Sequence, residues 1–377
     1  MRTPFIFLTM FDYPTRYAHA VHGLHMARAF SAREDLEFNF LVNTVTDDTL
    51  AGIPHTCLFG SWGRWVKKAR LRRALLPLAF GIYMMQHRRL RRGVIFLNDP
   101  ALLFVAMIAH RLFGFRIIFE SHSLLSERKK AILNRHATCV LGVSEGICAD
   151  VRASLTAVPV HHLPNAVAVR AYDHKSADDR VSLRKELGIG TSDTVLGYIG
   201  RLSPLGEDKG IALMLEGLVQ LPKKTVALLV GAAKQEVETF SALAVSHGVA
   251  DRVFFVPHVQ PDAVPRYVLA CDVLIFVPPG GTVFFEKETS PMKLYEYMAS
   301  KRPIIVSDVP TNRAVLTDDE ARFVRAGSVS EFVAAVAEVT SPVNAPKVYA
   351  RAEAAYARVR SNSWDYRVGQ IVEWARA

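Results

Sequence analysis

The chain has 377 residues, of which 50% are hydrophobic and 22% are charged, so it can fill sizeable cores and does not have the composition of a disordered protein. At roughly 150 residues per domain, this length predicts about two to three domains. The net charge of +10 is concentrated in one segment, which excludes a uniformly basic surface of the kind that binds nucleic acid.

The N-terminal apolar run at residues 5–10 is too short for the hydrophobic region of a signal peptide and reaches Asp12 directly. We therefore expect a first strand here and a cytoplasmic protein. No run of about 18 apolar residues is present, so no membrane-spanning helix is expected. The 4 cysteines form no C-x-x-C pair, which indicates free thiols and excludes a disulfide scaffold and a zinc module.

Residues 62–92 form a basic segment whose Arg and Lys side chains account for the whole excess of positive charge. Apolar residues from Trp62 to Ala69 recur at helical spacing, so rings and charges would lie on opposite faces of a helix that Pro77 ends or kinks. We interpret the segment as a helix that binds an anionic membrane at its inner face. A solvated surface and an acidic partner remain the alternatives.

Short apolar runs alternate with helical patterns in both halves of the chain, which predicts βαβ units and two parallel sheets covered on both faces. The runs lie at residues 5–9, 37–42, 94–98, 116–120 and 138–143, and then at 194–200, 225–231, 252–257, 272–278 and 303–308. We expect Rossmann-like domains at 1–170 and 194–345, a linker at 171–193, and helices at 346–377 that pack on the first domain. Ligands of such sheets bind beyond the carboxyl ends of the strands, here in a cleft between the domains.

The stretch FEKETSPMKLYEYMASKRPIIVSD at 285–308 predicts an anion site at a helix start. Ser290 suits the N-cap and Pro291 the first helical position, and the free N–H groups there attract phosphates. Glu288 precedes the cap and Glu296 follows it by about one and a half turns. Two carboxylates around a phosphate site suit a nucleotide sugar, whose hydroxyls they would bind.

The stretch GYIGRLSPLGEDKG at 197–210 places two cations beside a strand end. The strand ends at Gly200, Arg201 follows at its tip, and Lys209 opens the next helix. Such preorganised cations would neutralise a departing diphosphate.

His19, His22 and His25 recur every three residues, but no acidic or thiol ligand accompanies them. We therefore expect them to spread around a helix and expect no metal site.

These stretches resemble family 4 of the retaining glycosyltransferases, which have the GT-B fold. The resemblance rests on the E-x7-E pair Glu288 and Glu296 behind GRLSPLGEDKG, and continues through LLVGAAKQ, RVFFVPHV and ACDVLIFVPP over most of residues 195–339. In the first half, YPTRYAHAVHGLHMARAF and IIFESHS resemble the N-terminal domain of these enzymes, and LPNAV at 163–167 resembles their interdomain junction.

The resemblance implies how a donor would be bound. Arg201 and Lys209, after Gly200, would hold its pyrophosphate, and Glu296 would bind the ribose. Glu288 and the backbone around Ser290, Pro291 and Met292 would grip the transferred sugar, His258 and Val259 would lie near the base, and His122 would lie beside the anomeric centre. A phosphate contact from the first loop would come from Arg16.

The resemblance also implies a reaction. A sugar would pass with retention from a nucleoside diphosphate sugar to a hydroxyl of a glycan or lipid-linked glycan, in cell-envelope or exopolysaccharide synthesis. No metal or other cofactor is implied, and the chain has no D-x-D motif. No side chain stands out as a nucleophile, which agrees with a front-side mechanism in which the departing phosphate helps to deprotonate the acceptor. The alternatives are a nucleotide-sugar epimerase and a non-catalytic nucleotide-binding protein of the same fold.

Overall fold

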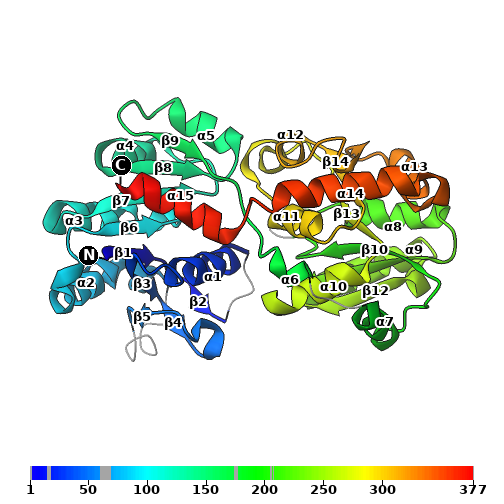
Figure 1. The fold of residues 1–377 in the computed structure, drawn as a ribbon, viewed down its shortest axis with the longest axis horizontal. Coiled ribbons are helices and arrows are strands. Elements are labelled where there is room, and N and C mark those ends of the chain that lie inside the picture. Colours follow the sequence, from blue (N-terminus) through cyan, green and yellow to red (C-terminus); the bar gives the residue numbers. More distant parts are fainter. Residues whose placement is uncertain are drawn as a thin grey trace. The chain divides into compact units, whose positions relative to one another are not determined.

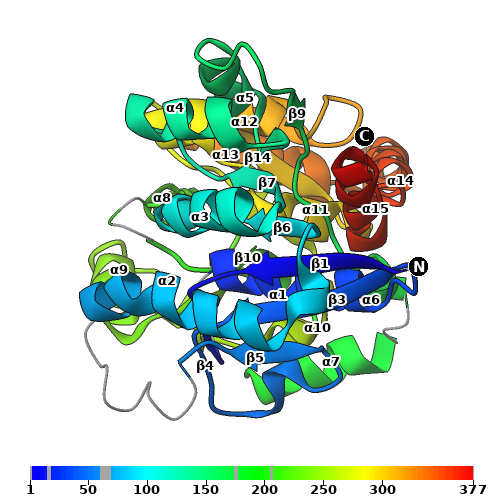
Figure 2. The ribbon, with the colours of Figure 1, turned by 90° about the vertical axis from the view of Figure 1, so that its left-hand side faces the viewer.

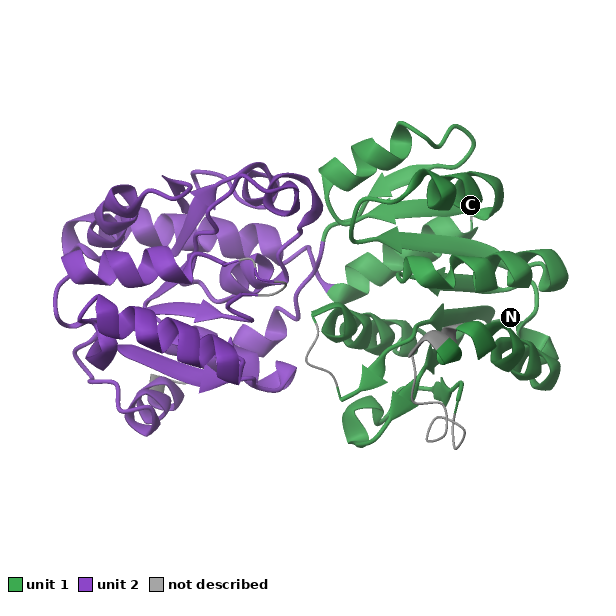
Figure 3. Cartoon of the chain, turned by 180° about the vertical axis from the view of Figure 1, so that it is seen from behind, with its two compact units in different colours: residues 1–164, 364–377 green, residues 165–363 purple. Residues whose placement is uncertain are grey.

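The computed structural model describes residues 2–14, 18–59, 69–173, 177–203, 206 and 208–376. The chain forms two units, each built on its own sheet (Figure 3). Unit 1 contains residues 1–164 and 364–377, and unit 2 contains residues 165–363. Unit 2 is therefore inserted in the sequence between two parts of unit 1.

Unit 1 is built on a seven-stranded sheet in the order β5-β3-β1-β6-β7-β8-β9, in which all pairs are parallel (Figure 1). Its strands are β1 (Thr3–Leu8), β3 (Leu36–Val42), β5 (His55–Cys57), β6 (Val94–Leu97), β7 (Arg116–Ser121), β8 (Cys139–Gly142) and β9 (Val160–His162), with a separate pair β2 (Asp12–Tyr13) and β4 (Thr44–Val45). Its helices are α1 (Ala18–Ser31), α2 (Ala69–Gln86), α3 (Leu103–Phe113), α4 (Glu127–His136), α5 (Glu145–Arg152) and α15 (Trp364–Arg376).

Both faces of the unit 1 sheet are buried, which explains why its central strands are apolar throughout. Phe5 and Phe7 of β1 contact Phe30 of α1, whereas Ile6 and Leu8 belong to the core beneath α2 and α3. The alternation follows from the two-residue period of a strand. Helix α15 packs against α1, and its Arg376 donates a hydrogen bond to the Thr3 hydroxyl, so β1 and α15 lie close together (Figure 2).

Unit 2 is built on a six-stranded parallel sheet in the order β12-β11-β10-β13-β14-β15. Its strands are β10 (Thr194–Ile199), β11 (Thr225–Ala232), β12 (Val253–Pro257), β13 (Val273–Phe276), β14 (Ile304–Asp308) and β15 (Arg322–Arg325). Its helices are α6 (Arg170–Asp173), α7 (Ala177–Glu186), α8 (Ile211–Gln220), α9 (Lys234–Ser246), α10 (Val264–Ala270), α11 (Met292–Ala299), α12 (Pro310–Arg313), α13 (Val329–Thr340) and α14 (Ala345–Val359), with a π-helical turn η8 (Phe284–Glu288).

The strand order of unit 2 reverses direction between β10 and β13. Counted along this unit the order is 3-2-1-4-5-6, the doubly wound arrangement whose ligands bind beyond the carboxyl ends at the reversal. Each strand expected from the apolar runs is present, within two residues of its predicted bounds. The expected α/β class with two Rossmann-like sheets is thus confirmed.

The domain boundaries differ from the expected ones. The expected linker at 171–193 contains α7, which packs against α10, so it belongs to unit 2. The expected tail at 346–377 divides: α14 packs on α11 in unit 2, and α15 alone returns to unit 1. Helix α14 is amphipathic and buries Val348, Ala352 and Val359 within unit 2, which outweighs its polar composition.

Pro77 does not end the helix, contrary to one of the two expected outcomes, because α2 continues through Pro77 to Gln86. Leu76 and Phe80 on either side of it are buried. Burial of such side chains contributes roughly 1.5–3 kcal/mol each, which offsets the roughly 3 kcal/mol cost of an internal proline. Residues 60–68, which include Trp62 and Trp65, lie outside the described residues.

Candidate functional site

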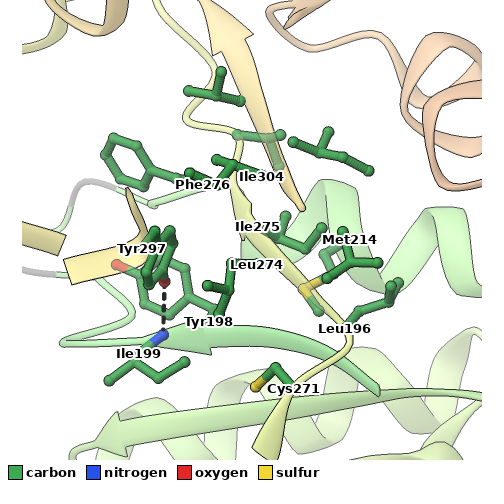
Figure 4. Close-up of a cluster of buried hydrophobic side chains, with 14 of the residues drawn as sticks. Leu196, Tyr198, Ile199, Met214, Cys271, Leu274, Ile275, Phe276, Tyr297 and Ile304 are labelled. Atoms are coloured by element: carbon green, nitrogen blue, oxygen red, sulfur yellow. Dashed lines mark hydrogen bonds between the residues drawn. The ribbon is translucent and has the colours of Figure 1, made fainter. Parts of the chain in front are cut away.

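Helix α11 is fixed to the carboxyl end of β10 by a buried tyrosine. β10 and β13 pair only through Leu196 and Gly197, so the last residues of β10 lack that neighbour. The hydroxyl of Tyr297 accepts a hydrogen bond of 3.0 Å from the N–H of Ile199 at this position (Figure 4). Tyr297 is fully buried, and this contact holds the second half of α11 beside the strand reversal.

Lys209 lies in an aromatic enclosure formed by the turn that precedes α11. Its side chain is 5% exposed, and its Nζ lies 4.0 Å and 4.2 Å from the ring centroids of Phe284 and Phe285. Its backbone N–H donates to the carbonyl of Leu202. Gly210 then packs so closely on Val277 that a Cβ at this glycine would lie 2.2 Å from the Val277 carbonyl oxygen. The loop after β10 is thereby held against the end of β13.

The free N–H groups at the N-terminus of α8 already have an acceptor. The carboxylate of Asp208 accepts hydrogen bonds from the N–H groups of Gly210, Ile211 and Ala212 at 2.9–3.2 Å. Asp208 thus occupies the N–H groups that a bound anion would use. The cationic Lys209 side chain, and not the helix start, is what this loop offers to a phosphate.

Arg201 emerges at the tip of β10, as expected, and its guanidinium lies 3.5 Å from the carboxylate of Glu236. Glu236 is itself held by the N–H groups of Ser203 and Ala233. Gly200, directly before Arg201, has a φ of 136°, in the range that favours glycine. Glu236 therefore positions the arginine, which remains half-exposed.

The structure shifts the predicted helix start by one residue. Pro291 occupies the N-cap position and Met292 begins α11, whereas Ser290 lies before the helix. The Ser290 hydroxyl accepts the N–H of Asn165, and its carbonyl accepts the Asn165 amide. This contact to a distant segment replaces the local cap. Glu288 ends the η8 turn and is half-buried.

Glu296 and Lys293 form a half-buried pair one helical turn apart on α11. Burial raises the pKa of Glu296 to about 7, and the nearby ammonium of Lys293 opposes this shift. Burial lowers the pKa of Lys293 to about 8. The Lys293 Nζ lies 4.7 Å from the ring centroid of Tyr198, and a Cβ at Gly200 would lie 3.2 Å from it. Lys293 therefore adds a cation to the carboxyl end of β10.

The other predicted donor residues lie at separate positions. His258 and Val259 follow β12, at the edge of the unit 2 sheet, and are half-buried. Arg16 lies outside the described residues. His122 belongs to unit 1, where it follows β7.

His122 is part of a buried cluster with Glu120, His22 and Arg367. Its Nε2 lies 3.4 Å from Glu120 Oε2, and the His22 Nε2 lies 3.6 Å from Glu120 Oε1. Arg367 of α15 donates to Glu120 Oε1 and to the carbonyls of Leu163 and Pro164. The rings of His19 and His22 lie against His122, and those of His22 and His25 lie against Trp364. The expectation that no acidic residue accompanies these histidines is wrong, because Glu120 lies beside His22.

The sequence analysis missed the contribution of Lys293, Phe284, Phe285 and Arg367. Only for Lys293 could a local signal have been used, because a lysine in the first turn of a helix opposes the helix dipole and therefore suggests a function. The contacts of Phe284 and Phe285 with Lys209, and of Arg367 with Glu120, join residues more than 70 positions apart. No local pattern encodes such pairs.

Residues 179–353 match the family model of the glycosyl transferases group 1. The chain is 25% identical over 264 residues to the putative teichuronic acid biosynthesis glycosyltransferase TuaH of Bacillus subtilis, which covers 67% of this chain and 62% of that protein. It is 27% identical over 137 residues to a D-inositol 3-phosphate glycosyltransferase of Nocardia farcinica, covering 35% of this chain and 29% of that protein. The chain thus spans less than two thirds of the length of these relatives.

Two solved structures share the fold over nearly the whole chain. HepE of Anabaena, solved with UDP and glucose, has a TM-score of 0.77 at 19% identity and covers 100% of both chains. WaaG, a glycosyltransferase involved in lipopolysaccharide biosynthesis, has a TM-score of 0.67 at 16% identity and covers 98% of both. These likenesses confirm the expected GT-B fold.

Proposed function

We propose that the protein is a retaining, metal-independent glycosyltransferase that moves a sugar from a nucleoside diphosphate sugar to a hydroxyl of a glycan or lipid-linked glycan. The observation that carries the proposal is the buried cation Lys209, which lies against Phe284 and Phe285 in the loop after β10, where the strand order of unit 2 reverses. The match of residues 179–353 to group 1 glycosyl transferases supports it.

Lys209 and Arg201 hold the donor diphosphate in this proposal. Phe284 and Phe285 exclude water from the Lys209 ammonium, which strengthens its attraction for a phosphate oxygen. Glu236 keeps Arg201 directed along the loop. Because these cations are in place before the reaction, they stabilise the charge that develops on the departing phosphate without reorganisation.

The remaining residues bind the rest of the donor. Glu296 accepts hydrogen bonds from the ribose, and Glu288 with the backbone of residues 290–292 binds the transferred sugar. His258 and Val259 contact the base, and His122 contacts the sugar at its anomeric centre. Arg16 makes a further phosphate contact.

Uridine diphosphate is the first donor base to test, because HepE was solved with UDP and with UDP-glucose. The name of TuaH places that relative in teichuronic acid synthesis. We propose a corresponding role for this chain in assembling a cell-envelope or extracellular polysaccharide, with the acceptor still attached to its lipid.

The test begins with a thermal-shift panel of nucleoside diphosphates and their sugars, followed by a transfer assay with the donor that binds. Lys209→Met is expected to lose about 10²-fold in turnover, and Arg201→Ala a similar factor. Lys234→Met is the matched control, because Lys234 is an exposed lysine of the same unit. Near-normal turnover of Lys209→Met would remove this residue from the mechanism.

Two other functions fit the same fold. A nucleotide-sugar epimerase would convert its donor without an acceptor, which NMR of the donor alone would reveal. A non-catalytic protein would bind the donor but would not turn it over, whichever acceptor is supplied. Either result would replace the transferase proposal.

We further propose that α2 and the basic residues around it bind an anionic membrane at its inner face. Leu71, Leu78, Ile82 and Met85 are 39–60% exposed and recur along α2 at helical spacing. An apolar stripe flanked by Arg side chains is typical of an interfacial helix, and each basic residue contributes roughly 1 kcal/mol near anionic lipid. Among the described helices, none is long and apolar enough to cross a membrane.

Flotation with liposomes tests this surface. Wild-type protein is expected to float with vesicles containing phosphatidylglycerol and to remain below with neutral vesicles. Leu78→Ser combined with Met85→Ser should weaken flotation, whereas Val343→Ser, an exposed apolar residue of unit 2, serves as the control. Equal flotation of all three proteins would refute the role of α2.

A further inference from the structure

The cluster around Glu120 joins three elements of unit 1 that are far apart in the sequence. His22 comes from α1, Glu120 and His122 from the end of β7, and Arg367 from α15. Glu120 is 0% exposed, His22 and Arg367 are each 1% exposed, and the His122 side chain is 11% exposed. Only His122 therefore reaches the surface of this cluster.

Each oxygen of the Glu120 carboxylate has a different neighbour. Oε1 accepts a hydrogen bond from Arg367 and lies 3.6 Å from His22 Nε2. Oε2 lies 3.4 Å from His122 Nε2. The guanidinium thus anchors one oxygen. The other oxygen faces His122 Nε2 across 3.4 Å without a hydrogen bond, and neither of these two buried atoms has another hydrogen-bond partner among the described residues.

The guanidinium of Arg367 is a counter-ion of Glu120. His22, Glu120 and His122 bring three metal-ligating atoms within 4.8 Å of one another, a set of the kind that binds zinc. Arg367, however, already contacts the carboxylate from the fully buried side, and a second cation there would meet its repulsion. Burial lowers the pKa of Arg367 only to about 9, so it stays charged at neutral pH.

Both histidine rings of the cluster are neutral. Burial lowers the pKa of His122 to about 3, and burial together with the charges of His122, Arg367, His19 and His25 lowers that of His22 far below its usual value. A neutral imidazole has one N–H and one acceptor nitrogen. Since an ionised carboxylate only accepts, the ring nitrogen of His122 that faces it carries the proton.

We propose that Glu120 and Arg367 are positioning residues that fix His122 as the Nε2-protonated tautomer, so that its Nδ1 accepts a hydrogen bond from a sugar hydroxyl. The proposal rests on the proposed function for the contact between His122 and a sugar. Nδ1 has no hydrogen-bond partner in the described part of the chain and is not among its buried, unpaired atoms. It is thus available to a ligand.

The role of Arg367 follows from what Glu120 would do without it. A buried carboxyl group without a cation takes up a proton. The resulting O–H would donate to His122 Nε2, and the ring proton would move to Nδ1. That nitrogen would then be a donor, and the acceptor presented to the sugar would be lost.

The tautomer of His122 is the direct test, and it needs no substrate. Long-range ¹H–¹⁵N NMR of histidine-labelled protein distinguishes the two ring nitrogens, and His122→Asn identifies the resonance. We expect the Nε2–H form in the wild type and in Arg367→Lys, and the Nδ1–H form in Glu120→Gln, whose amide can donate to Nε2. Glu145→Gln, which alters an exposed carboxylate near His162 in the same unit, is the control and leaves the tautomer unchanged.

Turnover provides the second test. Glu120→Gln is expected to lower kcat by about 10-fold to 10²-fold with a smaller change in the KM for the donor, because the residues proposed to bind the ribose and the base, and Lys209 and Arg201 for the diphosphate, lie in unit 2 and are unaltered. Glu145→Gln keeps wild-type kcat. An Nδ1–H form in the wild type, a wild-type kcat in Glu120→Gln, or a stoichiometric Co²⁺ complex whose visible absorption is lost in His122→Asn would each overturn the proposal. Failure of the wild type to bind or turn over any nucleotide sugar would instead refute the proposed function and leave the NMR result standing.

Discussion

Replacing Arg367 by methionine tests whether unit 1 depends on one buried ion pair. The guanidinium is 1% exposed and its partner Glu120 is 0% exposed. Without its partner the buried Glu120 must either stay charged or take up a proton, and breaking such a pair costs roughly 3–5 kcal/mol. Arg367→Met also removes the donor to the Leu163 carbonyl, at 2.6 Å.

Arg376→Met is the matched control, because Arg376 lies on the same helix and pairs with Asp35 at 2.7 Å. These side chains are 44% and 39% exposed, and exposed pairs contribute about 1 kcal/mol or less. Asp35 also keeps its contact with Arg33 in this variant. The two substitutions thus differ mainly in the burial of the pair that they break.

Urea unfolding followed by tryptophan fluorescence measures both variants, since α15 carries Trp364 and Trp374. With an m value of roughly 2 kcal/mol/M, Arg367→Met should lower the midpoint by about 1.5–2.5 M and Arg376→Met by about 0.5 M or less. Adding Glu120→Leu to Arg367→Met should recover part of the loss, because no unpaired charge remains. Equal midpoints for the two single variants, or additive losses in the double variant, would refute the reasoning.

Three further predictions concern unit 2 and the thiols. Gly210→Ala should lower the free energy of unfolding by more than about 2 kcal/mol in a urea titration, because φ at this position is 93° and the added Cβ would meet Val277. Gly52→Ala is the control: φ is 77° there but the space is open, so the loss should be only about 1–2 kcal/mol. Burial raises the pKa of Glu296 to about 7. Between pH 4.5 and 7 the Glu296 carboxyl is therefore protonated in the folded state and ionised in the unfolded state, so the stability of the wild type falls as the pH rises through this range. The free energy of unfolding of Glu296→Gln, measured relative to that of the wild type, should therefore increase as the pH rises through this range. If the difference between the two proteins stayed constant with pH, Glu296 would not be desolvated in the folded state. Ellman's reagent at about pH 8 should react in the folded protein with about one thiol, that of Cys57, because Cys57 is half-buried whereas the other three thiols are buried. Burial raises the pKa of all four thiols. Rapid reaction of two or more would contradict the burial of the other three.

The parallel sheets could be predicted because their central strands are buried on both faces. Ile304–Asp308, for example, is a short apolar run between two helical patterns. The edge strands β9 and β15 were missed, since Val160–His162 and Arg322–Arg325 mix apolar with polar or charged residues. Edge positions tolerate such residues because one side faces away from the core.

The candidate site could be predicted where a local motif marks it and not where tertiary contacts build it. Arg201 and Lys209 follow from a strand end and a turn. The shift of the first helical residue from Pro291 to Met292 could not be foreseen, because Asn165 engages Ser290 from a distant segment. In the same way, a polar helix at 364–376 indicated packing on another domain but not which of its side chains would be buried.

The insertion of residues 165–363 into unit 1 imposes an order on biosynthesis. A ribosome that has made β7 must still synthesise residues 122–367, which include all of unit 2, before Arg367 exists, a delay of about 12–50 s at roughly 5–20 residues per second. During that time the nascent N-terminal part lacks both the cation of Glu120 and the buried face of α15. We expect unit 2 to reach its native state first and the N-terminal part to remain a client of chaperones until translation supplies α15.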